Sequence, residues 1–185
     1  MRKNLATKRN ILLPMALYDI DPGTKESINV IVEIPKGSHN KYELDKDTGL
    51  IKLDRAHYGA ASYPVEYGFV PRTLAEDGDA LDVLLLSTYP LHPGVLVETR
   101  PVAFMEMTDD GEADGKIIGV PAEDRRWDDV NDVGDLNQHL LKELKDFFEN
   151  LKNLKGKPVV VTVHGFKGKE EAVAAFEKAC AAYKK

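Results

Sequence analysis

Apolar side chains form short runs along the first two thirds of the chain and periodic stretches in the last third. Residues 28–35 form a mainly apolar run that ends at a proline, and residues 83–87 and 117–121 form two more. Each run has the length and β-branched content of a buried strand. Residues 95–107 also have strand character, and we expect Pro101 to break this segment because proline cannot donate to a sheet ladder.

A hairpin is indicated between the first two of these runs. Residues 41–46 and 50–55 alternate polar with apolar side chains on either side of Asp47-Thr48-Gly49. Alternation of this kind around a short turn is typical of two paired strands. Lys41 and Arg55 fall on this hairpin, and taken singly they are ordinary surface charges.

Helical periodicity begins near residue 136. Leucine and phenylalanine recur over residues 136–151 at the spacing of a helix that buries one stripe, and we expect Asp135 to be its N-cap. A second amphipathic helix is predicted over residues 170–183, with Cys180 as a core residue. Strands followed by helices predict an α+β fold that is mainly β, with the helices at the C-terminal end.

Composition narrows the class of protein. The chain has 185 residues, of which 43% are hydrophobic and 30% charged, and its net charge is -6. This size predicts a single domain over residues 1–185, and the acidic balance argues against a nucleic-acid partner. No apolar run approaches the roughly 20 residues that cross a membrane, and the charged first residues do not resemble a signal peptide. With one cysteine, Cys180, no internal disulfide can form, so we expect a cytoplasmic protein.

Two acidic turns carry the candidate chemistry. Asp77, Asp79 and Asp82 surround Gly78 directly before the strand at residues 83–87. Carboxylates this close repel one another unless cations lie between them, and hard divalent cations prefer such oxygen ligands. A second acidic run, residues 109–116, leads into the strand at 117–121. Either turn alone could simply be a solvated loop, but together they could meet at one end of a barrel and share metal ions.

These segments resemble the soluble family I inorganic pyrophosphatases of the bacterial type. The similarity extends from about residue 33 to residue 152 and follows one order: Glu-Ile-Pro at 33–35, Lys-Tyr-Glu at 41–43, Asp-Arg at 54–55, Tyr-Pro-x-x-Tyr-Gly at 63–68, the acidic turn at 77–83, Tyr-Pro-Leu-x-Pro-Gly at 89–94, Arg-Pro-Val at 100–102 and Met-Thr-Asp at 107–109. The resemblance implies an OB-like closed five-stranded β-barrel with flanking C-terminal helices. It also implies a homo-oligomer, with a hexamer favoured for bacterial members of this length.

The resemblance implies an inorganic diphosphatase, which hydrolyses pyrophosphate to two orthophosphates with a metal-activated water. Asp79 would be the general base. Several Mg2+ ions, with Mn2+ or a similar divalent ion as a substitute, would be held by Asp77, Asp82, Asp114, Asp109, Glu33 and Glu43. The substrate would be bound by Lys41, Arg55, Tyr67, Lys116 and Lys152. Many cations are expected at such a site because the substrate is a small polyanion that repels an attacking water.

Two positions depart from the family pattern. Ala80 stands where proline or glutamate is usual, which frees the backbone of the acidic turn but removes no ligand. Leu151 stands where the family has a substrate-binding tyrosine, next to Lys152. A leucine cannot donate a hydrogen bond to phosphate, so we expect weaker substrate binding with the chemistry retained.

Two other functions remain as alternatives. A different Mg2+-dependent phosphohydrolase with an Asp-x-Asp nucleophile would place its aspartates after a strand, at the C-terminal edge of a parallel sheet. Here the strand follows the acidic turn, and no alternation of strands and helices is visible. A non-catalytic OB-like binding module would need a basic, aromatic face with few carboxylates.

Overall fold

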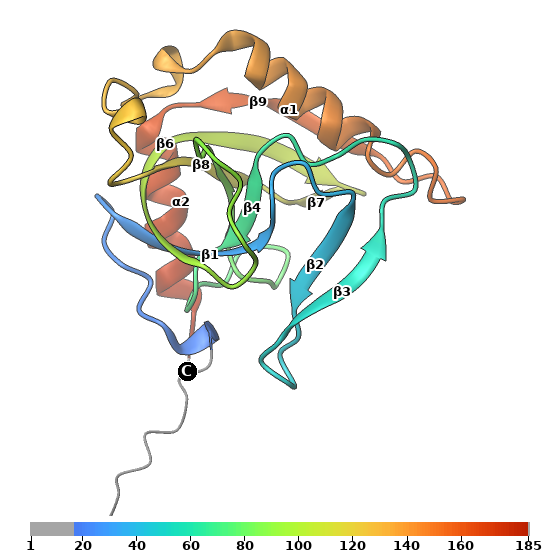
Figure 1. Cartoon of the computed structure of the whole chain (residues 1–185), viewed down its shortest axis with the longest axis horizontal. Helices are drawn as coiled ribbons and strands as arrows, with labels where there is room; N and C mark the ends of the chain where they lie inside the picture. The colour runs from blue at the N-terminus through green and yellow to red at the C-terminus, as the bar shows by residue number, and fades with distance from the viewer. Residues whose placement is uncertain (1–16, 185) are drawn as a thin grey trace, which may run out of the picture.

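Five strands close into a ring in the computed structural model, which describes residues 17–184 (Figure 1). Around the ring, the strands are β1 (Ile28–Ile34), β4 (Glu66–Phe69), β5 (Asp82–Leu85), β8 (Lys116–Pro121) and β6 (Leu96–Asp109). The ring closes because β6 also pairs with β1. This is the five-stranded barrel expected from the sequence. The expectation that the first residues are no signal peptide lies outside the described residues.

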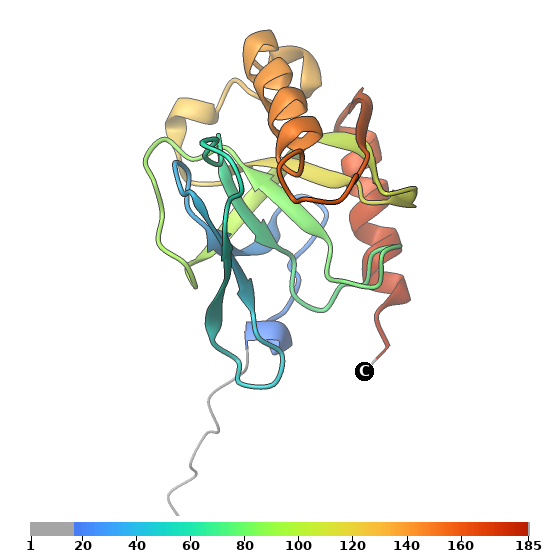
Figure 2. The same cartoon turned by 90° about the vertical axis from the view of Figure 1, so that its right-hand side faces the viewer.

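The remaining elements surround the ring. β2 (Asn40–Leu44) and β3 (Ile51–Ala56) form the expected hairpin, which extends away from the barrel (Figures 1 and 2), while β7 (Glu112–Ala113) and β9 (Val161–Lys167) pair with β6. Two α-helices, α1 (Gln138–Asn150) and α2 (Lys169–Ala182), pack outside the ring. The described residues also include three short 3-10 helices: η1 (Leu17–Asp19), η2 (Arg125–Trp127) and η3 (Val133–Asp135). No helix among the described residues has both the length and the apolar content needed to cross a membrane.

Strand β6 differs from the sequence expectation. It continues through Pro101 for 14 residues instead of breaking there. Its pairing with β8 shifts register between Pro101 and Ala103. A bulge tolerates proline because one residue in it needs no ladder hydrogen bond. Elsewhere the strands approach closely: a Cβ atom added to Gly68 on β4 would lie 2.1 Å from the carbonyl oxygen of Ile31 on β1.

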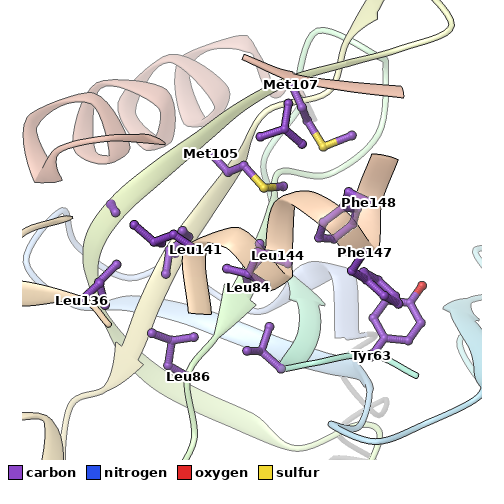
Figure 3. Packing of buried hydrophobic residues seen from close by; sticks show 14 of the residues in the cluster. Tyr63, Leu84, Leu86, Met105, Met107, Leu136, Leu141, Leu144, Phe147 and Phe148 are labelled. Atoms are coloured by element: carbon purple, nitrogen blue, oxygen red, sulfur yellow. The ribbon is translucent and has the colours of Figure 1, made fainter. Parts of the chain in front are cut away.

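Helix α1 covers one side of the barrel core. Its buried residues are Leu141, Leu144, Phe147 and Phe148, which pack with strand residues such as Leu84 and Met105 in one apolar cluster (Figure 3). Burial of side chains of this size stabilises the fold by about 1.5 to 3 kcal/mol each. The C-terminal end of α1 is thereby held beside Tyr63 and Met107, at one end of the ring (Figure 3).

The structure corrects two sequence predictions about the helices, one on where α1 begins and one on the burial of Cys180. The N-cap of α1 is Asn137, whose side-chain oxygen accepts from the backbone N–H of His139. Asp135, which we expected in that position, instead completes a capping box with Asp132 in η3. Because Asp135 belongs to the 3-10 helix η3, α1 starts two residues later than predicted. Cys180 on α2 is half-buried at the edge of an apolar cluster around Phe176 rather than within it.

Candidate active site

A single cavity of about 350 Å3 collects every site residue predicted from the sequence. It opens between the β2–β3 hairpin, the acidic turn before β5, the start of β8 and the C-terminal end of α1. The carboxylates that line it are Glu33, Glu43, Asp77, Asp79, Asp82, Asp109 and Asp114. The predicted phosphate-binding residues Lys41, Arg55, Tyr67, Lys116 and Lys152 line it too. The two acidic turns therefore meet at one end of the barrel.

The barrel aligns the residues at the centre of the cavity. β5 and β8 are parallel neighbours, with Val83 opposite Ile117. Their first residues, Asp82 and Lys116, therefore lie side by side. The Lys116 ammonium lies 2.7 Å from Oδ2 of Asp82 and 2.7 Å from Oδ1 of Asp114, so one cation bridges two carboxylates. The hydroxyl of Tyr67, on the adjacent strand β4, also donates to Asp82.

Lys116 is a buried charge that its neighbours keep protonated. Its side chain is only 3% exposed. Burial opposes the charge, but the carboxylates of Asp82 and Asp114 more than offset this and raise the pKa of Lys116 above its ordinary value. The rings of Tyr67 and Phe148 also face the ammonium, with centroids at 5.3 and 5.8 Å. Removing either carboxylate would leave this charge partly unpaired.

Glu33 and Asp114 hold protons more tightly than ordinary carboxyl groups. Burial raises the pKa of Glu33 to about 8, with Asp82 and Glu43 adding to the shift. A 2.6 Å hydrogen bond from the backbone N–H of Leu44 opposes it only in part. Burial likewise raises the pKa of Asp114, against the attraction of Lys116. Glu33 would therefore bind a divalent cation with release of a proton at neutral pH.

Asp79 occupies a more open position. Gly78 takes a φ of +87°, which turns the backbone sharply, and the backbone N–H of Asp79 donates to Asp77 at 3.0 Å. The Asp79 side chain is 71% exposed, compared with 21% for Asp82 and 18% for Asp114. A carboxylate at this rim can contact water within the cavity, which a general base requires.

The basic residues of the cavity are all paired with carboxylates in the described structure. Lys152 forms an ion pair with Asp109, Lys41 with Glu43, and Arg55 with Asp54. Over residues 17–184, no three acidic, histidine or cysteine side chains are gathered closely enough to hold one metal ion as they stand. The Lys116 ammonium lies between two of them, Asp82 and Asp114. A divalent ion would therefore displace lysines from the carboxylates.

The residues present fit divalent metal ions. All seven carboxylates offer oxygen ligands, the type that Mg2+ and Mn2+ prefer. Asp82 and Asp114 already share one cation, the Lys116 ammonium, at 2.7 Å each. Their spacing thus suits a bridged positive charge at the point where the sequence predicted metal ligands.

The sequence analysis missed two polar residues of the cavity, Lys46 and Tyr18. Lys46 stands next to the hairpin turn, outside the family signature, and Tyr18 lies in a short 3-10 helix without a clear pattern. Lys46 is the last residue of the predicted strand 41–46, and Tyr18 lies ten residues before the first predicted strand, so the pattern of neither segment indicated a site. Leu151 also lines the cavity, where it joins Met107, Phe148 and Val161 in an apolar wall.

Comparison with known proteins finds a matching family model and similar sequences over most of the chain. The family model "Inorganic pyrophosphatase" matches residues 30–184. The chain is 49% identical over 162 residues to the inorganic pyrophosphatase of Thermus thermophilus, covering 86% of this chain and 91% of that one. It is 46% identical over 156 residues to that of Geobacillus stearothermophilus, covering 84% and 93%.

Solved structures of other proteins share the fold of this chain. The crystal structure of the Thermus thermophilus inorganic pyrophosphatase superposes with a TM-score of 0.88 at 46% identity, covering 92% of this chain and 99% of that chain. The Helicobacter pylori inorganic pyrophosphatase gives a TM-score of 0.85 at 41% identity, covering 89% and 98%. The family model, the sequence relatives and the solved folds agree over most of the chain. It belongs to the inorganic pyrophosphatase family, whose members use divalent metal ions.

Proposed function

We propose that this protein hydrolyses inorganic pyrophosphate to two orthophosphates, with Mg2+ as the activating metal and Mn2+ as a possible substitute. The observation that carries the proposal is the composition of the cavity: seven carboxylates and five basic side chains face the same 350 Å3 space. Carboxylates alone would hold cations, and basic residues alone would hold anions. A site with both suits a polyanion that binds together with several metal ions.

The side chains divide into three roles. Lys41, Arg55, Lys116 and Lys152 would bind phosphate oxygens, and Tyr67 would orient Asp82 through its hydroxyl. The metal ions would be held by Asp77, Asp82, Asp109 and Asp114, with Glu33 and Glu43 in support. When bound, these ions lower the pKa of the attacking water and neutralise charge on the phosphates. Asp79, at the exposed rim, would accept the proton from that water.

The two alternatives from the sequence now lack support. The strand β5 follows the acidic turn, so Asp77 and Asp79 precede a strand and are not placed as an Asp-x-Asp nucleophile would be. A binding module without catalysis would not need the buried Asp82–Lys116–Asp114 arrangement, which costs desolvation of three charged groups.

We also infer a homo-oligomer, with a hexamer favoured, in the cytoplasm, and a single domain over residues 1–185. The family resemblance supports the oligomer, and the single cysteine, Cys180, supports the cytoplasm. Strand β6 pairs with both β1 and β9, which brings distant parts of the chain into one sheet. This supports a single domain. Light scattering after size-exclusion chromatography should give the mass of several chains. A mass of one chain at micromolar concentration would reject the oligomer.

A phosphate-release assay tests the proposed function. We expect rapid release of phosphate from pyrophosphate in the presence of Mg2+, loss of that activity in EDTA, and recovery when Mg2+ is restored. ATP serves as the control substrate and should release phosphate far more slowly under the same conditions. Absence of metal-dependent release from pyrophosphate, or equal release from ATP, would reject the proposal.

A further inference from the structure

Lys46 is a fifth basic residue in the cavity, and the family signature does not include it. It is contributed by the β2–β3 hairpin and reaches across the cavity mouth to the acidic turn. Its ammonium donates to Oδ1 of Asp79 at 2.8 Å. It therefore lies directly beside the carboxylate to which we assign the general-base role.

An aromatic support holds the ammonium at this position. Lys46 Nζ lies 5.7 Å from the centroid of the Tyr18 ring, within the range of a cation–π contact. The Tyr18 ring stacks in turn on Phe69 of β4, with centroids 5.2 Å apart. The side chain is thus supported from the barrel as well as from its carboxylate partner.

The hairpin turn fixes the backbone from which Lys46 extends. The Asp45 carboxylate accepts from the hydroxyl of Thr48 at 2.9 Å and from the backbone N–H of Asp47 at 3.2 Å. The backbone N–H of Gly49 also donates to the carbonyl of Asp45 at 2.7 Å. Local hydrogen bonds of this kind define the turn and hence the direction of the Lys46 side chain.

We propose that Lys46 is a substrate-binding residue that leaves Asp79 and binds a phosphate group when pyrophosphate enters the cavity. This inference rests on the proposed function and adds one residue to it. Both partners of the pair are more than half exposed, at 59% and 71%, so their attraction is screened and the pair contributes little to stability. A polyanionic substrate is the stronger partner for the ammonium.

The exchange would have two effects on the reaction. The phosphate gains a charged hydrogen bond from a side chain that is 59% exposed, in addition to any from the buried Lys116. At the same time Asp79 loses the cation that occupies its Oδ1 and becomes free to accept a proton from water. Lys46 would thus bind substrate and unmask the base in the same movement.

Kinetics of Lys46→Met, with Lys52→Met as the matched control, test the proposal. Lys52 lies on the same hairpin and is exposed, but it is not among the cavity-lining residues. We expect Lys46→Met to raise the KM for pyrophosphate about tenfold, with a smaller change in kcat. Lys46→Arg, which keeps the charge, should restore most of the wild-type KM. Lys52→Met should leave both constants unchanged.

Binding of the non-hydrolysable analogue imidodiphosphate, measured calorimetrically with Mg2+ present, gives a second readout that does not depend on turnover. Its Kd should rise in Lys46→Met by the same factor as the KM and stay at the wild-type value in Lys52→Met. If Lys46→Met has the same Kd and the same KM as Lys52→Met, the proposed role of Lys46 is overturned. If wild-type protein hydrolyses no pyrophosphate in this assay, the proposed function fails instead, so the two failures are distinguishable.

Discussion

At the scale of single residues, opposite charges placed within hydrogen-bonding distance decide what the cavity can do. Lys116 is buried, yet it stays charged because Asp82 and Asp114 flank it at 2.7 Å. Asp79 is exposed and pairs with Lys46. The same residue type therefore serves different roles, because burial and neighbours differ. Side chains of the cavity can therefore be tested one at a time.

Asp79→Asn and Asp82→Asn should each lower kcat for pyrophosphate by at least about 100-fold, because the first removes the proposed proton acceptor and the second a proposed metal ligand. Steady-state phosphate release measures the effect. Far-UV circular dichroism should remain native in both variants, and Asp129→Asn, at an exposed position, should behave as wild type. Near-normal turnover by a folded Asp79→Asn or Asp82→Asn protein would remove these role assignments.

Leu151→Tyr should lower the KM for pyrophosphate by about tenfold. Leu151 lines the cavity beside Lys152, so a tyrosine hydroxyl there could donate to a phosphate oxygen. Hydrogen bonds to charged groups contribute about 1.5 to 3 kcal/mol, and 1.4 kcal/mol corresponds to a factor of ten. Leu151→Phe, which adds the ring without the hydroxyl, is the control. A KM that does not fall would mean that another group already makes this contact.

Glu33→Gln should stabilise the metal-free protein at pH 8 but not at pH 4.5. The folded-state pKa of Glu33 is about 8, against an ordinary value of 4.5. Between these values the folded chain holds a proton that the unfolded chain has lost, so wild-type stability falls as pH rises. Glutamine does not ionise, and its carbonyl can still accept from the N–H of Leu44. At pH 8 the free energy of unfolding of the variant should therefore exceed that of the wild type by up to about 4 kcal/mol.

Urea unfolding in EDTA at pH 4.5 and pH 8 measures this difference. The matched control is Glu26→Gln, since Glu26 is exposed. A free energy of unfolding that differs from wild type by the same amount at both pH values would contradict the shifted pKa of Glu33.

At the scale of secondary structure, hydrophobic pattern predicted which elements form better than where they end. The run at residues 28–35 became β1, and the alternation around Gly49 became the β2–β3 hairpin, because each pattern matches the side-chain period of a strand. The predicted start of α1 was wrong. Asp132, Asp135 and Asn137 are three possible caps within six residues, and propensity alone does not choose among them. The bulge at Pro101 depends on pairing with β8, which is a tertiary contact.

Asn137→Ala should lower the free energy of unfolding by about 0.5 to 2 kcal/mol, the usual cost of removing an N-cap. The residue satisfies the backbone N–H of His139 at the start of α1. Denaturant unfolding measures the loss, and Asn137→Ser, which can cap in the same way, should recover most of it. If the alanine and serine variants have equal stability, Asn137 does not cap the helix.

At the scale of the whole molecule, the barrel brings together residues that lie more than a hundred positions apart in sequence. Glu33 on β1 and Lys152 after α1 line the same cavity as the two acidic turns. The family resemblance predicted this set because its motifs follow a fixed order. Lys46 and Tyr18 escaped prediction because their place depends on how the hairpin and η1 pack against β4, which no local pattern encodes.

The central claim is that carboxylates from separate strands and turns together hold several divalent ions. Titration of metal-free protein with Mn2+, with free Mn2+ measured by electron paramagnetic resonance, tests this most directly. We predict that wild-type protein binds more than one Mn2+ ion per chain, and that Asp77→Asn combined with Asp109→Asn, which leaves both carboxylate partners of the buried Lys116 in place, lowers this binding while the protein stays folded. Binding of Mn2+ by the folded double variant with wild-type stoichiometry and affinity would contradict the claim.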